Sequence, residues 1–300
     1  MMTTKYRPRR TMLYVTAHNA RHLEKSRHLP ADTIIFDLQE SVPPKEKENA
    51  RKMLEDKFSG SKDFGYSERV LRVNPLDSKW FQEDLKLLKD IDFHAVMFPR
   101  IESKERLLEA IAEADRVSGK KLDIMINIES PLGVLKAEEI IGCSKRIVAV
   151  VMGTTDLSNE LKITPTGNRI GLVTSLSLVI LAARAHQRCV VDGPHLQLKD
   201  IEACEFSCRQ ARDLGFDGKA VIHPIQLAYT NDAFTPKSAD VKRAQRIIDA
   251  INEAHTKGRS TAVLDDRLIE PGLEEWAKRI IRLYERVHEI GQDELVSGQK

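Results

Sequence analysis

Two carboxylates close neighbouring apolar runs of the chain. Glu129 ends the run DIMINIE, and Asp156 follows the run RIVAVVMG. Two carboxylates have little reason to lie together unless a cation neutralises them. Mg²⁺ binds one or two carboxylates together with waters and substrate oxygens. The pair therefore predicts a magnesium site; the alternative is that each carboxylate caps a helix or pairs with an arginine.

Other polar residues also follow apolar runs. Arg72 lies within VLRVNP and needs a carboxylate, phosphate or carbonyl partner. That partner is either a substrate or a structural ion pair, with Asp37 as one candidate. His223, which precedes Pro224, is either a ligand-binding residue or a hydrogen-bonded structural residue, and its backbone is a further candidate contact. The remaining polar strand ends are Asn74, Arg100 and Asp192.

A pair of basic residues lies near the start of the chain. Arg21 and Lys25 are four residues apart in a helical pattern, so they share one helix face. They form either an anchor for a phosphorylated cofactor or an ordinary solvated face.

The elements that position these residues alternate between strands and helices. Short runs rich in Val, Ile and Leu, separated by helical segments, predict buried parallel strands. Eight such units predict a (β/α)8 TIM barrel over residues 1–235, with its chemistry at the carboxyl ends of the strands. No GxGxxG follows the first strand, which disfavours dinucleotide binding. The predicted strands are Thr11–Ala17, Thr33–Gln39, Arg69–Asn74, His94–Arg100, Asp123–Glu129, Arg146–Gly153, Arg188–Gly193 and Lys219–Pro224.

The pattern changes after the last predicted strand. Residues 236–300 contain two amphipathic helical segments separated by a short apolar stretch and a turn. We expect a C-terminal helical extension that covers the mouth of its own barrel or of a neighbouring one. Its apolar faces favour a homo-oligomer.

Composition excludes several classes of protein. The net charge of +2 gives no basic field for nucleic acid, and no apolar run approaches the roughly 20 residues of a membrane span. The basic start is followed only by a short apolar run, so we expect a cytoplasmic protein. Cys204 and Cys208 are four residues apart in a helical pattern, which favours helix packing over a zinc or redox pair.

Several motifs occur in an order that resembles a known family. They are RRTMLYVTAHNARHLEKS, ADTIIFDLQESVPPKEKENAR, LRVNP, INIESPLGV, VVMGTTDL, VVDGP and GKAVIHPIQL. They span almost the whole chain and resemble the citrate lyase β-subunit-like (HpcH/HpaI aldolase/citrate lyase) family, of the acyl-CoA lyase type. The resemblance implies a TIM barrel, trimeric or hexameric, that makes or breaks a carbon–carbon bond between an acyl-CoA and a 2-oxo acid.

The resemblance also implies roles for particular residues. Glu129 and Asp156 are expected to hold Mg²⁺, and Arg72 is expected to bind the substrate near its thioester carbonyl. The CoA portion of the substrate is expected to contact residues near the first and last strands, namely Tyr14, Arg21, Lys25 and the backbone around Ile222 and His223.

The family's catalytic acid/base lies in the C-terminal segment and is usually supplied by a neighbouring subunit. Glu270 stands at that position, where the family more usually has Asp, and Asp266 stands where it has Gly. Gln39 and Glu40 stand where the family pattern prefers Glu and Asp. An added methylene moves a carboxylate by more than about 1 Å, which can change a rate about 100-fold. These departures predict an altered substrate preference, a weaker lyase, or thioester hydrolysis.

The sequence thus predicts a Mg²⁺-dependent lyase that cleaves a 3-hydroxyacyl-CoA of the citramalyl-CoA or malyl-CoA type to acetyl-CoA and a 2-oxo acid. A malyl-CoA-type thioesterase and a CoA-independent 2-oxo-acid aldolase are alternatives. If the substrate carries no CoA, as in the aldolase, Arg21 and Lys25 should be dispensable. A non-catalytic subunit that binds CoA or an oxo acid is the third alternative.

Overall fold

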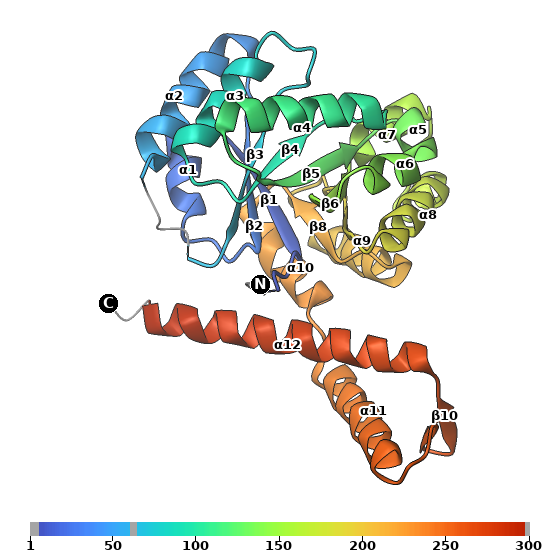
Figure 1. Ribbon diagram of the computed structural model, residues 1–300. Helices are drawn as coiled ribbons and strands as arrows, with labels where there is room; N and C mark the ends of the chain where they lie inside the picture. The colour runs from blue at the N-terminus through green and yellow to red at the C-terminus, as the bar shows by residue number, and fades with distance from the viewer. Residues whose placement is uncertain (1–5, 61–64, 298–300) are drawn as a thin grey trace. The chain divides into compact units, whose positions relative to one another are not determined.

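The computed structural model describes residues 6–60 and 65–297. The chain forms two compact units (Figure 1). One runs from Arg9 to Phe234, and the other combines residues 6–8 with the described residues from Thr235 onward. The boundary expected after residue 235 lies next to this division. Each unit has its own hydrophobic core.

The first unit is a closed barrel of eight parallel strands in sequence order, which confirms the predicted (β/α)8 fold. The strand β1 pairs with both β2 and β8, so the sheet has no free edge. The strands are β1 (Thr11–Thr16), β2 (Thr33–Asp37), β3 (Glu68–Arg72), β4 (Ala95–Phe98), β5 (Asp123–Ile128), β6 (Ile147–Met152), β7 (Cys189–Asp192) and β8 (Gly218–Val221).

Helices follow the strands and cover the outside of the barrel (Figure 1). Ser103 caps the start of α4, and Gly119 ends it with a φ of 68°, a conformation that glycine adopts without strain. The helices are α1 (Ala20–Ser26), α2 (Lys47–Phe58), α3 (Phe81–Asp90), α4 (Lys104–Ser118), α5 (Pro131–Leu135), α6 (Ala137–Gly142), α7 (Thr154–Glu160), α8 (Ile170–Ala185), α9 (Ile201–Leu214) and α10 (Leu227–Phe234), with 3₁₀ turns η1 (Pro44–Glu46) and η2 (Pro224–Gln226).

The barrel interior determines which strand residues face the site. Met12, Ile35, Val70, Met125 and Val191 belong to the small cluster that fills the interior. Successive strand residues alternate between the two faces of a sheet. The interior face therefore continues through residues 14, 37, 72, 127 and 129, whereas residue 192 faces the helices.

The second unit consists of two helices and a hairpin. They are α11 (Ser238–Thr256), the antiparallel strands β9 (Ala262–Leu264) and β10 (Arg267–Ile269), and α12 (Pro271–Ser297). Asp265 and Asp266 form the hairpin turn with φ values of 50° and 58°. Such turns favour Gly, Asn and Asp, so Asp266 fits this position.

The structure offers no candidate for a membrane span within residues 6–60 and 65–297, because none of the helices there is both long and apolar enough.

Candidate active site

Glu129 follows β5 and lies buried at the barrel mouth, with 4% of its surface exposed. Its Oε1 accepts a hydrogen bond of 2.7 Å from the backbone N–H of Arg100. Gly153 follows β6 and lies against the same side chain, so a Cβ there would collide with Glu129. The glycine therefore makes room for the carboxylate.

The surroundings of Glu129 disfavour its negative charge. Burial raises the pKa of Glu129 to about 7, and the charges of Glu40 and Asp156 also raise it. Arg72 and the N–H of Arg100 act in the opposite direction but do not prevail. A bound cation would relieve this unfavourable charge.

Asp156 lies half-buried in the first turn of α7, just after Gly153. The structure therefore brings Glu129 and Asp156 within electrostatic reach of each other. Among the residues that the structure describes, no group of three or more His, Cys, Asp or Glu side chains forms a metal cage. A pair of carboxylates is a donor set that suits Mg²⁺, which takes one or two carboxylates together with waters and substrate oxygens.

Arg72 forms a buried, two-pronged ion pair with Asp37. Its Nε and Nη2 atoms each donate to one carboxylate oxygen at 2.7 Å. Burial alone would raise the pKa of Asp37, but Arg72 and neighbouring hydrogen bonds hold that pKa below its usual value. The structural ion pair with Asp37 that the sequence suggested is therefore present. The Nη1 atom of Arg72 takes no part in it.

Tyr14 lies inside the barrel, with the Arg72 guanidinium 4.6 Å from its ring centre. Its hydroxyl contacts Asn127 Nδ2 at 3.4 Å and Met97 Sδ at 3.6 Å. Sequence reasoning did not select Asn127, although it lies two residues before Glu129 and so shares its face of the strand.

Arg21 and Lys25 are both exposed on α1. Within the described parts of the chain, neither side chain forms a hydrogen bond or ion pair. Their predicted contact with CoA stays a prediction.

At the end of β8, Ile222 and His223 are both exposed. His223 is the N-cap residue of η2, and its Nδ1 accepts a hydrogen bond from the backbone N–H of Ile225. The N–H of Ile222 donates to Gln226 Oε1 at 3.3 Å. The imidazole thus has the structural role considered from the sequence.

Glu270 belongs to the second unit, where it lies exposed between β10 and α12. Its carbonyl accepts a hydrogen bond of 2.9 Å from the N–H of Leu273 in the first turn of α12. Its predicted catalytic role stays a prediction.

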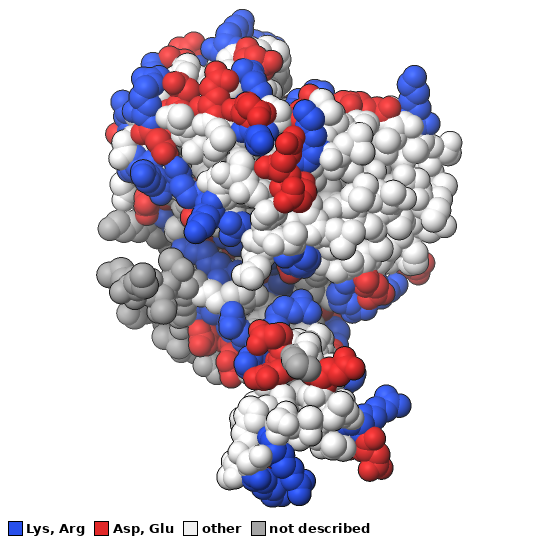
Figure 2. Space-filling model, turned by 45° about the vertical axis from the view of Figure 1, so that its right-hand side comes forward, with Lys and Arg blue, Asp and Glu red and all other residues white. Residues whose placement is uncertain are grey.

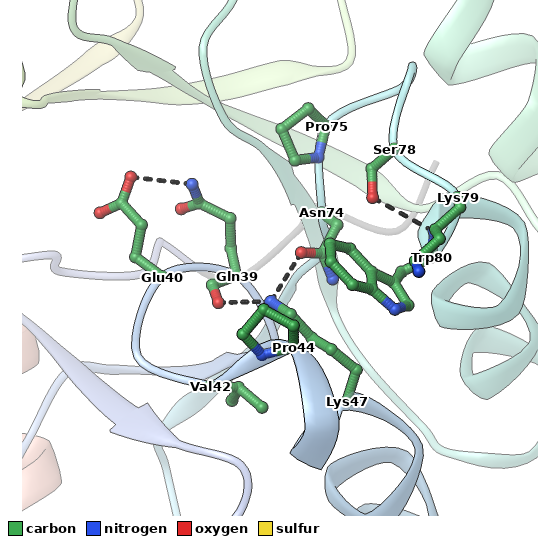
Figure 3. Close-up of a pocket in the computed structure, with 10 residues that line it drawn as sticks. All are labelled: Gln39, Glu40, Val42, Pro44, Lys47, Asn74, Pro75, Ser78, Lys79 and Trp80. Atoms are coloured by element: carbon green, nitrogen blue, oxygen red, sulfur yellow. Dashed lines mark hydrogen bonds between the residues drawn. The ribbon is translucent and has the colours of Figure 1, made fainter.

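A pocket of about 650 Å³ opens at the carboxyl ends of β2 and β3 (Figure 3). The Lys47 ammonium donates to the carbonyls of Leu38 and Gln39 and to Asn74 Oδ1 at 2.6 to 2.8 Å. These bonds tie the loop after β2 to the end of β3. The lining residues are Gln39, Glu40, Val42, Pro44, Lys47, Asn74, Pro75, Ser78, Lys79 and Trp80.

Two other features found in the sequence lie outside the barrel interior. Asp192 is fully buried and pairs with Lys219 and Arg169 on the helix side of the sheet. Cys204 and Cys208 are buried free thiols on α9, as expected for helix packing.

Comparison with known proteins identifies the family. The model of the HpcH/HpaI aldolase/citrate lyase family matches residues 10–224, which is most of the chain. The chain belongs to this family. The resemblance inferred from the ordered motifs is thus confirmed.

Individual relatives within the family carry different names. The chain is 37% identical over 269 residues to a (3S)-malyl-CoA thioesterase of Cereibacter sphaeroides, covering 90% of this chain and 92% of the relative. It is 32% identical to the citrate lyase subunit beta of Haemophilus influenzae, covering 91% and 96% respectively.

Among solved structures, a citrate lyase beta subunit from Mycobacterium tuberculosis complexed with oxaloacetate and magnesium is similar to this chain. Its TM-score is 0.64 at 26% identity, and the match covers 76% of this chain and 98% of that one.

Proposed function

We propose that this protein is a Mg²⁺-dependent enzyme that cleaves the carbon–carbon bond of a 3-hydroxyacyl-CoA of the malyl-CoA or citramalyl-CoA type, giving acetyl-CoA and a 2-oxo acid. The observation that carries the proposal is the pairing of buried Glu129 with Asp156 beside Arg72 at the barrel mouth. Two carboxylates and a cationic guanidinium can bind a substrate that carries a carboxylate, a hydroxyl and a thioester.

Glu129 and Asp156 would hold the metal. Once bound, Mg²⁺ supplies Lewis-acid stabilisation of the negative charge that develops on the substrate oxygens. Its presence with oxaloacetate in the M. tuberculosis relative supports this choice of ion. Gly153 leaves the space that Glu129 needs.

The chain's own residues supply the rest of the reaction. Glu270 accepts the proton of the C3 hydroxyl as general base. The electron pair of the C2–C3 bond moves to C2, so the 2-oxo acid separates from a thioester enolate. Arg72 stabilises the charge on the enolate oxygen through Nη1, while Asp37 holds the guanidinium in place. A proton delivered to C2 by the protonated Glu270 completes acetyl-CoA.

Thioester hydrolysis is the second candidate, and the 37% identity to a (3S)-malyl-CoA thioesterase favours it. In this reaction a water oxygen forms a bond to the thioester carbonyl carbon, and the carbon–sulfur bond breaks. One water proton ends on the sulfur of free CoA. Arg72 can serve both reactions, because each places negative charge on the thioester oxygen.

The test is an assay of the purified protein with malyl-CoA and citramalyl-CoA, followed by mass spectrometry. We expect acetyl-CoA and a 2-oxo acid, in amounts that vanish with a chelator and in Glu129→Ala. Release of free CoA without a 2-oxo acid would show that the enzyme hydrolyses the thioester instead of cleaving the carbon–carbon bond. Binding of the CoA ester without turnover would support the non-catalytic alternative.

The Glu270 position has its own discriminating variant. Glu270→Gln should abolish turnover if Glu270 is the acid/base, with Glu275→Gln on the exposed face of α12 as a matched control. Loss of activity in Glu270→Asp would mean that the longer side chain is fitted to its own substrate. A gain would indicate that the site has diverged from the family's usual reaction.

We also propose that the protein is a cytoplasmic homo-oligomer, a trimer or hexamer, and that the barrel contributes an interface. Leu132 and Leu135 of α5 and Leu178 and Leu181 of α8 are 44%, 78%, 42% and 67% exposed. Figure 2 brings this side of the barrel forward and shows a broad area without charged side chains. Leu135→Glu combined with Leu181→Glu should reduce the mass measured by light scattering; an unchanged mass would reject this surface as the interface.

A further inference from the structure

The middle of the barrel interior is apolar, whereas polar residues such as Glu68 and Arg72 lie nearer its two ends. The cluster that fills it contains Met, Ile, Val and Ala residues. Tyr14 and Asn127 introduce a hydroxyl and an amide into this environment and meet each other at 3.4 Å. Phe and Leu would fill nearly the same space without polar groups. Polar groups that lack good partners in such surroundings reduce stability, so the pair calls for a functional explanation.

The hydrogen bonds of the pair are incomplete. Asn127 is 2% exposed, and its Oδ1 has no hydrogen-bond partner. The Tyr14 hydroxyl faces the sulfur of Met97 at 3.6 Å, and a thioether is a weak acceptor. One strong donor and one strong acceptor therefore remain available side by side.

The group that satisfies both is an O–H group, which accepts from Tyr14 and donates to Asn127. Turning the Asn127 amide round does not change this result. Oδ1 would then accept from Tyr14, and Nδ2 would be available to donate. An O–H group would accept from Nδ2 and donate to the Tyr14 oxygen.

The position of the pair connects it to the site above. Asn127 lies two residues before Glu129 on β5, and the Tyr14 ring lies 4.6 Å from the Arg72 guanidinium carbon. Tyr14 is only partly buried, although helices cover the outer face of its strand. Burial also raises the pKa of Tyr14, so its hydroxyl keeps its proton at neutral pH.

We propose that Tyr14 and Asn127 bind and position one reacting O–H group at the floor of the site. This inference rests on the proposed function, which supplies two sources of such a group. One is the C3 hydroxyl of the 3-hydroxyacyl-CoA. The other is the water that attacks the thioester, whose oxygen bonds to the carbonyl carbon while the carbon–sulfur bond breaks and one proton passes to the sulfur.

The variants Tyr14→Phe and Asn127→Leu remove the polar atoms and keep the shape. Met97→Leu is the matched control, because it touches the same hydroxyl and conserves volume. Thermal unfolding should show that all three variants fold. The readouts are the ratio of free CoA to 2-oxo acid released from malyl-CoA, and the affinities for malyl-CoA and for succinyl-CoA, which lacks the hydroxyl.

The two sources give different results. If the group is the substrate hydroxyl, each variant should lose about tenfold in affinity for malyl-CoA, equivalent to one hydrogen bond of about 1.4 kcal/mol, and nothing for succinyl-CoA. If it is the reacting water, release of free CoA should fall about tenfold or more while both affinities stay unchanged. Met97→Leu should behave like the unaltered protein in both cases.

The affinity readout needs no turnover, so it separates this inference from the proposed function. Suppose that the protein does not turn over malyl-CoA but binds it more tightly than succinyl-CoA. If Tyr14→Phe and Asn127→Leu then lose this preference, the inference stands and the proposed reaction is rejected. If both variants fold and change neither the product ratio nor the relative affinity by more than about twofold, the inference is wrong. An ordered water at this position in a crystal structure, without those changes, would also overturn it.

Discussion

The two sides of the barrel mouth differ in how their polar groups are satisfied. At the ends of β2 and β3, Arg72 pairs with Asp37, and Lys47 donates three hydrogen bonds. Around β5, burial and the charges of Glu40 and Asp156 outweigh the effect of Arg72 on the Glu129 carboxylate, and the amide oxygen of Asn127 lacks a partner. The first side forms a framework, and the second is where a bound cation or substrate would gain the most.

The pKa values of the carboxylates on the two sides are shifted in opposite directions, that of Asp37 downward and that of Glu129 upward. Burial disfavours the charge of both, but Arg72 is near enough to Asp37 to hold its pKa below the usual value. For Glu129 burial prevails and raises the pKa to about 7. The same guanidinium therefore fixes one carboxylate as a structural anion and leaves the other ready for a cation.

The largest expected effect comes from breaking the framework. Arg72→Met leaves Asp37 buried without its counterion, so the free energy of unfolding should fall by about 3 to 5 kcal/mol. Urea unfolding measures this loss. The double variant Asp37→Leu, Arg72→Met should recover much of the stability, because neither charge is then stranded. An equal loss in both would show that the ion pair itself is not the cause.

The lysine of the framework should matter next. Lys47→Met removes three hydrogen bonds to buried acceptors and should cost about 2 to 4 kcal/mol in thermal or urea unfolding. Lys79 is the matched control, since both ammonium groups lie 5.1 Å from the centre of the Trp80 ring. Lys79 is exposed, so Lys79→Met should change stability by less than about 0.5 kcal/mol. Equal effects would mean that the loop anchorage contributes little.

Glu129, at the end of β5, should make the stability of the protein depend on pH. The pKa of Glu129 rises from 4.5 to about 7 on folding, so the folded state binds an extra proton between these values. Without metal, the free energy of unfolding should therefore decrease as pH rises through this range, by on the order of 2 to 3 kcal/mol. Unfolding followed from pH 4.5 to 8 tests this, and Glu129→Gln should remove this component of the slope. An unchanged slope in the variant would contradict the assignment.

The smallest effect should come from the glycine beside the carboxylate. Gly153→Ala forces Glu129 to move and should cost about 1 to 3 kcal/mol in unfolding. It should also weaken Mg²⁺ binding measured by calorimetry. Gly167→Ala is the control, because a Cβ there meets nothing within 4 Å. Normal Mg²⁺ binding by Gly153→Ala would show that the close approach does not position Glu129.

Much of the fold could be predicted because its signal is local. Apolar runs alternating with helical patterns identified eight strands, and the parallel barrel follows from that order. The small hairpin of β9 and β10 was not predicted as such, since three-residue strands carry little periodic signal. The strand ends also identified Glu129, Arg72 and Asp37 as residues of one region.

By itself, the sequence determined the strand order and hence the candidates at the carboxyl ends of the strands. Only the tertiary structure decided their partners. Asp192 forms an ion pair with Lys219 on the helix side of the sheet, and Asp37 forms one with Arg72. Asn127 forms a hydrogen bond with Tyr14 across the barrel. Side-chain periodicity is a local property of the chain, whereas the partner of a buried charge depends on how closed strands bring distant residues together.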